Sequence, residues 1–435
     1  MSEFLKLHSP FEALDVLLDA MPKRKIATEV VPTCQSLGRV LANDIHSAHP
    51  LPEFRRSSMD GYAVIAHDTF GASDTQPGYL SVIGEVLMGS EPDISIRPGT
   101  CALIHTGGML PNGANAVLIL EHTQVIEKGL RSRQPEQTAK SLGFSEIEIY
   151  KSITPGENII DIGEDIKENE IVLKAGTRIR PVEIGGCMAL GIVNIEVFSK
   201  PKIAILSCGD EIISPDKNTA PGKVRDINSY TMASLVDQLG GVPCIYGIIP
   251  DDLNKMTEKA SLSLTECDAL LITAGSSASS RDNTAIVISS LGKPGVLVHG
   301  INVKPGKPTI LAVCDGKPVL GLPGNPVSAL VIGQIFLPPV LGCLTGVQVI
   351  RPKPSIFVRI LINIASQTGR DDWIPVSIKQ RMDDGDNKST SLYEAEPIFS
   401  KSNLIFSLAK ADGLIHVPSS AVGIPAGDIV EAFLL

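Results

Sequence analysis

The chain has 435 residues, of which 43% are hydrophobic, and its formal net charge is −10 at pH 7. This length exceeds what one hydrophobic core normally serves, so about two to four domains are expected. The negative charge argues against a protein that binds nucleic-acid backbones. Any anion site must therefore be a local basic island in an acidic protein.

The N-terminus and the cysteines both favour a cytoplasmic protein. The first residues lack the basic and then apolar pattern of a signal peptide. The eight cysteines form no C-x-x-C pair, so neither a disulfide framework nor a zinc knuckle is predicted. The most apolar run, 329–344, is interrupted by Gln334 and Pro338-Pro339, which favours a core helix over a membrane span.

The N-terminal part of the chain predicts two helices and then a small β domain. The first helix is expected over 9–21, because Ser9 and Glu12 can form a capping box there. A second helix is expected over 33–41. Short apolar runs then alternate with turn signals between residues 44 and 150, at 79–86, 101–105 and 116–120. The polar stretch 124–145 is expected to be a hairpin excursion or a mobile loop.

From about residue 181 the pattern changes to strands that alternate with helices. Strands are expected at 202–207, 243–249 and 269–273, and helices at 228–239, 283–291 and 326–344. This alternation predicts a doubly wound parallel α/β sheet, in which ligands bind at loops beyond the carboxyl ends of the strands. The last part returns to short strands, at 355–362, 373–378 and 428–434, which predict a small β-barrel or sandwich.

The segment 303–309 is the most informative part of the sequence. Its lysines, Lys304 and Lys307, stand between Pro305, Gly306 and Pro308. Lysines that are held on a stiff loop lose less conformational entropy when they bind an anion. A Gly/Pro/Asn turn follows at 321–326 and opens into an apolar helix, whose N-terminus adds positive potential. An oxyanion or phosphate site is predicted, although solvated surface lysines remain the alternative.

Three other segments allow a structural or a functional interpretation. Asp60-Gly61 is either an ordinary turn or a turn that presents a carboxylate to a partner site. Asp210 and Glu211 follow a buried strand, where they either cap the next element or hold a divalent cation. The Ser/Gly stretch 273–282 is either a flexible loop or a phosphate cradle, with Asp282 near the start of the next helix.

Taken together, these motifs resemble those of the MoeA family, the molybdopterin molybdenumtransferases, relatives of the gephyrin E domain and of plant molybdenum-insertase proteins. The resemblance covers nearly the whole chain and keeps the order and spacing of the motifs. It rests on these segments: Ser58-Met59-Asp60-Gly61-Tyr62-Ala63, His105-Thr106-Gly107-Gly108-Met109-Leu110-Pro111, Glu121, Pro155-Gly156-Glu157-Asn158, Gly163-Glu164-Asp165-Ile166, Gly209-Asp210-Glu211, Lys304-Pro305-Gly306-Lys307-Pro308 and Gly321-Leu322-Pro323-Gly324-Asn325-Pro326.

The resemblance implies a multidomain architecture of α/β and β parts. An elongated N-terminal and linker domain would comprise 1–45 and 150–180, with a β domain inserted at 46–149. Residues 181–345 would form the doubly wound parallel α/β domain that binds molybdopterin, and 346–435 a C-terminal β-barrel.

The resemblance also implies the final step of molybdenum cofactor biosynthesis. In this reaction molybdate is inserted into the dithiolene of adenylylated molybdopterin, and AMP is released. A divalent cation, Mg²⁺, is expected to take part. The implied assembly is a homodimer, with each site between the α/β domain of one subunit and N-terminal elements of the other. Further expected partners are the molybdopterin adenylyltransferase and apo-molybdoenzymes, but neither nucleic acid nor a membrane.

The resemblance assigns roles to residues that match its motifs. The implied catalytic residues are Lys304, Lys307, Asp282 and Asp60. The implied cofactor-binding residues are Thr106, Asp210, Glu211, Gly275, Ser277, Pro308, Gly324 and Asn325. The implied metal ligands are Asp210, Glu211 and Asp282. The implied molybdate ligands are Lys304, Lys307, Arg370 and Ser402. Asp60 and Thr106 would reach the site from the partner subunit.

The chain departs from the family pattern at several glycines. Ala274 and Ser279 stand where glycines are usual in the loop after the third strand, and Lys401 and Asn403 replace glycines beside Ser402. A side chain at such a position restricts the backbone or crowds a ligand. Asn115 likewise replaces a usual aspartate. The alternative to the enzyme is therefore a non-catalytic relative or scaffold that binds molybdopterin or molybdate.

Overall fold

The computed structural model describes residues 7–22, 25–127, 130–132, 145–274, 278–352, 354–381, 393–399 and 401–435, with only the backbone at 127, 130–132, 145 and 278–282. The chain forms two compact units. The first comprises Met1–Asn43, Ala175–Ile184 and Val193–Leu435, and the second comprises Asp44–Lys174 and Gly185–Ile192. The four-part division given above is finer than this and stays a prediction.

The second unit is a β domain, as the sequence predicts. Its main sheet has seven strands, in the spatial order β7 (Ala116–Ile119), β4 (Gly61–Val64), β6 (Thr100–Ile104), β5 (Gly78–Glu85), β10 (Ser145–Ile149), β8 (Thr123–Glu127) and β9 (Leu130–Ser132). Tyr62, Leu80 and Ile147 belong to the buried core of the sheet. Gly61 has no room for a Cβ atom, which would lie 2.1 Å from the carbonyl oxygen of Leu118 on the adjacent strand.

Short elements complete the second unit. Two short strand pairs form, β2 (Ile45–His46) with β12 (Ile171–Leu173) and β3 (Arg56–Ser57) with β11 (Ile159–Ile160). The 3₁₀ turns are η2 (Ala66–Thr69) and η3 (Leu120–His122). Helix α2 (Pro181–Ala189) begins in the first unit and ends in the second.

The α/β part of the first unit contains a six-stranded sheet. Its strands, in spatial order, are β17 (Val242–Ile249), β14 (Lys202–Cys208), β18 (Ala269–Ala274), β22 (Lys317–Pro323), β21 (Ile310–Cys314) and β19 (Pro294–His299). The first four are parallel, whereas β21 runs antiparallel to both of its neighbours. The α/β class is confirmed, and β21 interrupts the all-parallel pattern because a tight Asp315-Gly316 turn joins it to β22.

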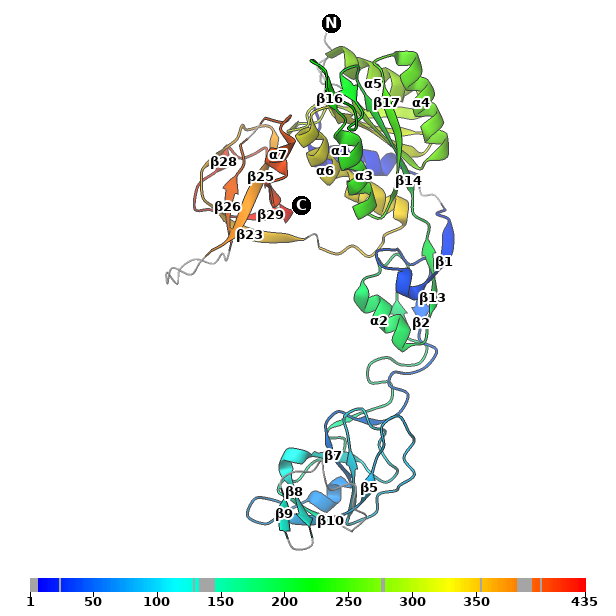
Figure 1. Cartoon of the computed structure of the whole chain (residues 1–435), viewed down its shortest axis with the longest axis vertical. Coiled ribbons are helices and arrows are strands. Elements are labelled where there is room, and N and C mark those ends of the chain that lie inside the picture. Colours follow the sequence, from blue (N-terminus) through cyan, green and yellow to red (C-terminus); the bar gives the residue numbers. More distant parts are fainter. Residues whose placement is uncertain are drawn as a thin grey trace. The chain divides into compact units, whose positions relative to one another are not determined.

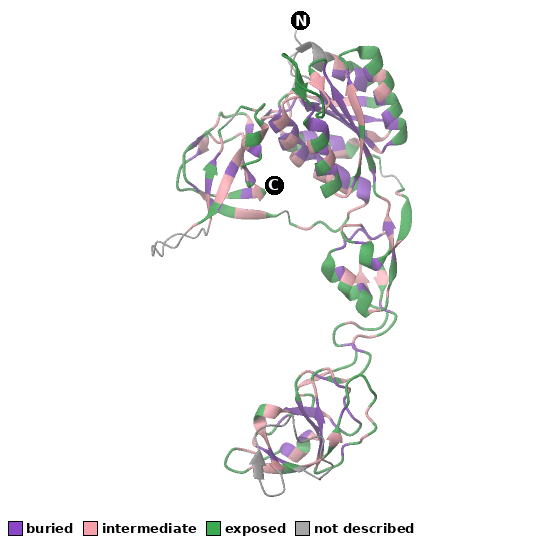
Figure 2. Ribbon diagram, in the orientation of Figure 1, coloured by how far each residue is buried: buried purple, intermediate pink, exposed green. Residues whose placement is uncertain are grey.

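Helices cover both faces of this sheet (Figure 1). On one face, α1 (Pro10–Ala20), α3 (Asn228–Gln238) and α6 (Pro326–Thr345) bury residues such as Leu17, Met232 and Phe336. On the other face, α4 (Leu253–Glu266) and α5 (Ala278–Ser290) bury residues such as Met256 and Val287. Figure 2 shows the resulting pattern, in which the central strands are buried and the outer helix faces are exposed.

Local sequence signals explain two of these helices. Helix α1 begins with the predicted capping box, in which the Glu12 N–H donates to Ser9 Oγ and the Ser9 N–H donates to the Glu12 carboxylate. Helix α6 has the length and mean hydropathy of a membrane span, but 61% of its most apolar window is buried inside the protein. It therefore serves as a core helix, packed against α3 and β22.

The C-terminal part of the first unit is a closed five-stranded barrel, as predicted. Its strands follow one another in the order β25 (Asp371–Gln380), β26 (Tyr393–Pro397), β23 (Ser355–Ile360), β29 (Ile429–Leu434) and β27 (Gly413–Val417), which returns to β25. A short ladder of β24 (Ile364–Ala365) with β28 (Gly423–Ile424) and the turn α7 (Ile405–Leu408) accompany it. A sixth strand, β20 (Val303–Lys304), comes from the α/β part and pairs in parallel with β25.

The predicted helix over 33–41 is wrong. Only a 3₁₀ turn, η1 (Thr33–Gln35), forms, and the backbone then turns at Gly38 with a φ of 74°. Val40 and Leu41 instead form β-bridges to Arg178 and Val197. Nearby, β1 (Thr28–Pro32) pairs with β13 (Asn194–Phe198). In the α/β part, β15 (Ile212–Ile213) pairs with β16 (Val224–Arg225). Tertiary pairing thus overrides a weak helical pattern.

Candidate functional site

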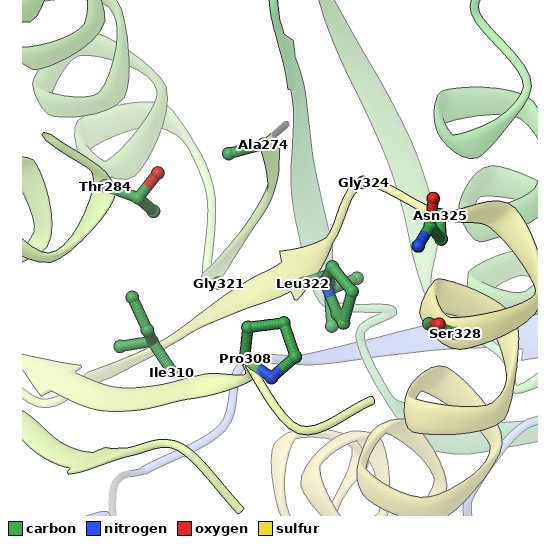
Figure 3. Close-up of a pocket in the computed structure, with 10 residues that line it drawn as sticks. Ala274, Thr284, Pro308, Ile310, Gly321, Leu322, Gly324, Asn325 and Ser328 are labelled. Carbon is green, nitrogen blue, oxygen red and sulfur yellow. The ribbon is translucent and has the colours of Figure 1, made fainter. Parts of the chain in front are cut away.

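A pocket lies at the carboxyl edge of the parallel strands in the α/β part. The pocket is small, with a cavity volume of about 60 Å³, and part of it is open to solvent. Its lining comes from the end of β18, from α5, from the start of β21 and from the turn between β22 and α6: Ala274, Thr284, Pro308, Ile310, Gly321, Leu322, Pro323, Gly324, Asn325 and Ser328. Figure 3 shows Thr284 and Asn325 on opposite sides of this pocket. The position agrees with the edge where open α/β sheets bind ligands.

The antiparallel direction of β21 brings the lysine loop to this edge. Ile310, the first residue of β21, pairs with Gly321 near the carboxyl end of β22, so the preceding residues 304–309 lie beside the pocket. Pro308 lines it directly. The base of the loop is held by the bonds Gly300 N–H to Thr309 O (2.8 Å) and Ile301 N–H to Lys307 O (2.9 Å).

The side chains of Lys304 and Lys307 are both exposed. Within the described part of the chain, neither ammonium group has an ion-pair or hydrogen-bond partner. Gly306 between them has a φ of 122°, and a Cβ atom there would lie 2.5 Å from the side chain of Ile332 in α6. The loop therefore presents two uncompensated positive charges on a backbone that is packed against the core.

The turn before α6 connects two predicted ligand residues from separate parts of the chain. Asn325 Nδ2 donates to Ser402 Oγ over 3.1 Å, and the Val327 N–H donates to the Ser402 carbonyl over 3.1 Å. The Gly324 carbonyl accepts from Asn228 Nδ2 (2.9 Å). Ser402 of the C-terminal part is thus brought to the N-terminus of α6, next to the pocket.

Arg370 already has a partner within the barrel. Its Nε and Nη2 donate to the two carboxylate oxygens of Asp372 at 2.8 and 3.2 Å, and the Asp372 side chain is almost completely buried. Ser366 Oγ also donates to Asp372. This bidentate pair fixes the guanidinium plane, so Arg370 can act on an anion only with the donors that Asp372 leaves unused.

The acidic loop after β14, which carries Asp210 and Glu211, lies beside a third carboxylate that the sequence does not indicate, Asp251 after β17. Asp210 and Glu211 follow the carboxyl end of β14, and Asp210 Oδ1 accepts from the Asp251 N–H (3.3 Å). Burial, together with the nearby carboxylates of Asp210 and Glu211, raises the pKa of Asp251. The Lys223 ammonium donates to the Asp210 carbonyl (2.6 Å). Three carboxyl groups therefore gather in this region, and their mutual repulsion is only partly relieved.

The predicted cradle between β18 and α5 is described only in part. Gly275 and Ser277 lie outside the described residues, and Asp282 lies in α5 with only its backbone described. Among the described residues, no group of three or more His, Cys, Asp or Glu side chains is arranged to hold a metal ion. The predicted metal set of Asp210, Glu211 and Asp282 therefore stays a prediction.

In the second unit, the structure brings Asp60 and Thr106 into contact. Asp60 Oδ1 accepts from the Thr106 N–H (2.7 Å) and from the Thr106 hydroxyl (3.2 Å). His105 stands beside them, with Nδ1 3.6 Å from Asp60 and Nε2 3.1 Å from Glu85. The Thr106 N–H above all, with the Thr106 hydroxyl and His105, lowers the pKa of Asp60. Asp60 is thus an oriented, exposed carboxylate.

Sequence reasoning missed Thr284, Ser328, Asn228 and Asp251. Thr284 and Ser328 are polar residues on helices, in positions that usually face solvent or the core. Only the helix starts at 278 and 326, both at the ligand edge of the sheet, would have indicated them. Asp251 follows β17, the strand next to β14, and the rule that parallel strands end at one edge would have grouped it with Asp210.

Comparison with known families divides the chain into three matched segments. Residues 8–191 match the model of the MoeA N-terminal region (domains I and II). Residues 204–342 match the model described as "Probable molybdopterin binding domain", and residues 358–435 match the MoeA C-terminal region (domain IV).

Curated relatives match the chain over almost its full length. A protein of Methanocaldococcus jannaschii, named for molybdopterin biosynthesis, is 35% identical over 98% of this chain and 96% of its own length. The molybdopterin molybdenumtransferase of a Nostoc species is 29% identical over 96% and 91%. The enzyme of that name from Bacillus subtilis is 28% identical over 94% and 90%.

Solved structures agree with this match. Two crystal structures of a molybdopterin biosynthesis MoeA protein from Pyrococcus horikoshii are similar to this chain. One has a TM-score of 0.80 at 30% identity and covers 99% of this chain and 100% of that chain. The other has a TM-score of 0.73 at 33% identity and covers 99% of both chains.

Proposed function

Because the chain belongs to the MoeA family of molybdopterin biosynthesis proteins, we propose that it is a molybdopterin molybdenumtransferase. It catalyses the final step of molybdenum cofactor biosynthesis. Its substrates are molybdate and adenylylated molybdopterin, and its products are the metal-loaded cofactor and AMP. The observation that carries this proposal is the loop of Lys304 and Lys307 beside the pocket at the carboxyl edge of the sheet.

We assign the binding of molybdate to the lysine loop, residues 304–309. Molybdate carries two negative charges, and fixed ammonium groups stabilise such an anion best where the loop does not have to reorganise. Gly324 and Asn325 line the adjoining pocket, and Ser402 is hydrogen-bonded to Asn325. These residues, with Pro308, would hold the part of the pterin that receives the metal. Arg370 would contribute its remaining donors from the barrel.

The phosphate end of the substrate is assigned to the acidic loop. Mg²⁺ usually binds to one or two carboxylates together with substrate phosphates, and Asp210 and Glu211 would offer such oxygen ligands. Burial above all raises the pKa of Asp251, and a divalent cation would relieve the added repulsion from Asp210 and Glu211. Gly275 and Ser277, with Asp282 in the first turns of α5, belong to the segment expected to hold the phosphates. When bound, the cation would neutralise charge on the phosphates as AMP leaves.

A homodimer completes the proposed site. Asp60 and Thr106 would serve the α/β site of the partner subunit, with Asp60 ionised through its bonds to Thr106. The protein would work in the cytoplasm, receive its substrate from a molybdopterin adenylyltransferase and pass its product to apo-molybdoenzymes.

AMP release by the purified protein from adenylylated molybdopterin tests this function. The reaction is run with molybdate, with tungstate and without either oxyanion, and the metal on the pterin is measured. Release that depends on an oxyanion, with metal found on the pterin, supports the transferase and ranks its metals. Tight substrate binding without release would instead identify a non-catalytic binding relative.

A further inference from the structure

One residue, Asn302, connects three segments of the first unit that are far apart in the sequence. Its backbone N–H donates to the His8 carbonyl (2.8 Å) in the N-terminal segment. Its carbonyl accepts from the Asp371 N–H (3.1 Å) at the start of the barrel strand β25. Its side-chain Nδ2 donates to the carbonyl of Gly369, just before that strand. Asn302 itself stands two residues before Lys304.

The two segments that hold Asn302 also pair with the residues on either side of it. Val303 and Lys304 pair in parallel with Asp371 and Asp372, so the backbone of Lys304 is part of the barrel sheet. His8 also forms a parallel bridge to Ile301, the residue before Asn302. The rest of the loop closes on itself, because Thr309 Oγ1 donates to the Gly306 carbonyl over 2.6 Å. The direction of Lys304 thus depends on its pairing with β25, and the Asn302 side chain adds a bond to the residues just before that strand.

The barrel side of this junction is itself held firmly. The carboxylate of Asp371, which is buried, lies 2.7 Å from His416 Nε2. The His416 ring stacks on Trp373 with the ring centroids 4.8 Å apart, and it contacts Phe11 of α1 edge-on at 5.7 Å. The same barrel corner therefore touches both the N-terminal helix and the lysine loop. Because these parts are already fixed, a side chain that bridges them orders little additional structure and loses little conformational entropy.

We propose that Asn302 is a positioning residue for the oxyanion site: its side-chain bond to the Gly369 carbonyl holds residues 303–309 against the barrel, which sets where the Lys304 and Lys307 ammonium groups stand. This inference rests on the proposed function of the lysine loop. Asn302 does not need to touch the anion itself. Small displacements of a positioned charge are costly in enzymes, by up to about 100-fold for 1 Å.

The test compares Asn302→Ala with Asn363→Ala in the full-length protein. Asn363 also makes a side-chain bond to a backbone group of the barrel, since its Oδ1 accepts from the Ala426 N–H, but within the described part of the chain it is not hydrogen-bonded to the lysine loop. In Asn302→Ala, we expect the KM for molybdate to rise about tenfold and the KM for adenylylated molybdopterin to stay within about twofold. Asn363→Ala should leave both KM values near those of the wild type.

Amide hydrogen exchange provides a readout that does not depend on activity. In Asn302→Ala, exchange at 303–309 should accelerate, while exchange in β18 stays unchanged. Unchanged exchange in the loop, or faster exchange with an unchanged molybdate KM, would overturn the inference. If Asn302→Ala does not fold, Asn302→Ser, whose side chain is too short to reach Gly369, takes its place. Wild-type protein without oxyanion-dependent AMP release would contradict the proposed function, and loop exchange would still decide whether Asn302 fixes the loop.

Discussion

At the scale of single residues, Lys307 is the sharpest test of the oxyanion site. Its side chain is exposed and has no described ion-pair partner, so Lys307→Ala removes a charge without removing a structural contact. We expect kcat/KM for molybdate to fall by about 100-fold, with the thermal unfolding midpoint unchanged. AMP release and calorimetry of the same preparations measure both quantities.

Lys255→Ala is the matched control for this variant, because Lys255 is an exposed lysine of the same α/β part, on helix α4. It should change neither the activity nor the unfolding midpoint. A Lys307→Ala protein that turns over at the wild-type rate would show that the loop does not bind the oxyanion.

The ion pairs of Glu183 should make the free energy of unfolding depend on pH. Its nearly buried carboxylate is paired with Arg180 (2.7 Å) and Arg351 (2.9 Å), and the hydrogen bonds from Arg180 above all lower the pKa of Glu183 to about 2. A lowered carboxyl pKa stabilises the folded state above the ordinary value of 4.5, and this contribution is lost as pH falls from there towards about 2. Because both arginines are partly exposed, Glu183→Gln should destabilise the first unit at pH 7 by an amount between the values for exposed pairs, about 1 kcal/mol, and for buried pairs, about 3 kcal/mol.

Scanning calorimetry between about pH 3 and pH 7 tests this prediction. The difference in unfolding free energy between wild type and Glu183→Gln should shrink as pH falls, because the Glu183 carboxyl becomes protonated. Glu258→Gln, on the exposed side of α4, serves as the comparison and should have little effect at any pH. If Glu183→Gln lowers the free energy of unfolding equally at about pH 3 and at about pH 7, ionic pairing is not the cause of the destabilisation.

At the scale of elements, the lysine loop requires a glycine at 306. Its φ of 122° is unfavourable for other residues, and the added Cβ would overlap the side chain of Ile332. Gly306→Ala should displace the loop and lower kcat/KM for molybdate by at least about tenfold, while Lys304 and Lys307 are retained. Gly247→Ala controls for backbone strain alone, because Gly247 also has a positive φ but no neighbour near its Cβ position. Equal activity of the two variants would argue against a shape requirement in the loop.

The elements that sequence could predict are those with strong local signals. The capping box of α1, the apolar strands β14 and β18 and the Gly/Pro/Asn turn before α6 all form where expected. Residues 33–41 have a weak helical pattern, and pairing with Arg178 and Val197 decides their structure. The direction of β21 likewise depends on which strand it joins. Long-range pairing of this kind leaves no local periodicity to read.

The site residues likewise divide into those with a local sequence signal and those that depend on long-range contacts. Lys304, Lys307, Asp60 and Thr106 belong to compact motifs, whose glycines and prolines mark unusual backbone. The carboxylate of Asp251, the hydroxyl of Thr284 and the bonds of Asn302 become meaningful only once separate strands end at one edge or separate segments meet. Sequence therefore indicates where the chemistry lies but not what positions it.

At the scale of the whole molecule, the proposed homodimer predicts that two inactive variants restore each other. If Asp60 serves the site of the partner, a heterodimer of Asp60→Asn with Lys307→Ala carries both lesions in one site and none in the other. Co-expression with two affinity tags isolates this heterodimer, which should have about half of the wild-type rate of AMP release. Each variant alone should be nearly inactive, because every one of its sites lacks a required charge. A heterodimer no more active than the two variants would show that Asp60 and Lys307 act within one subunit, and a protein that elutes as a monomer would contradict the shared site altogether.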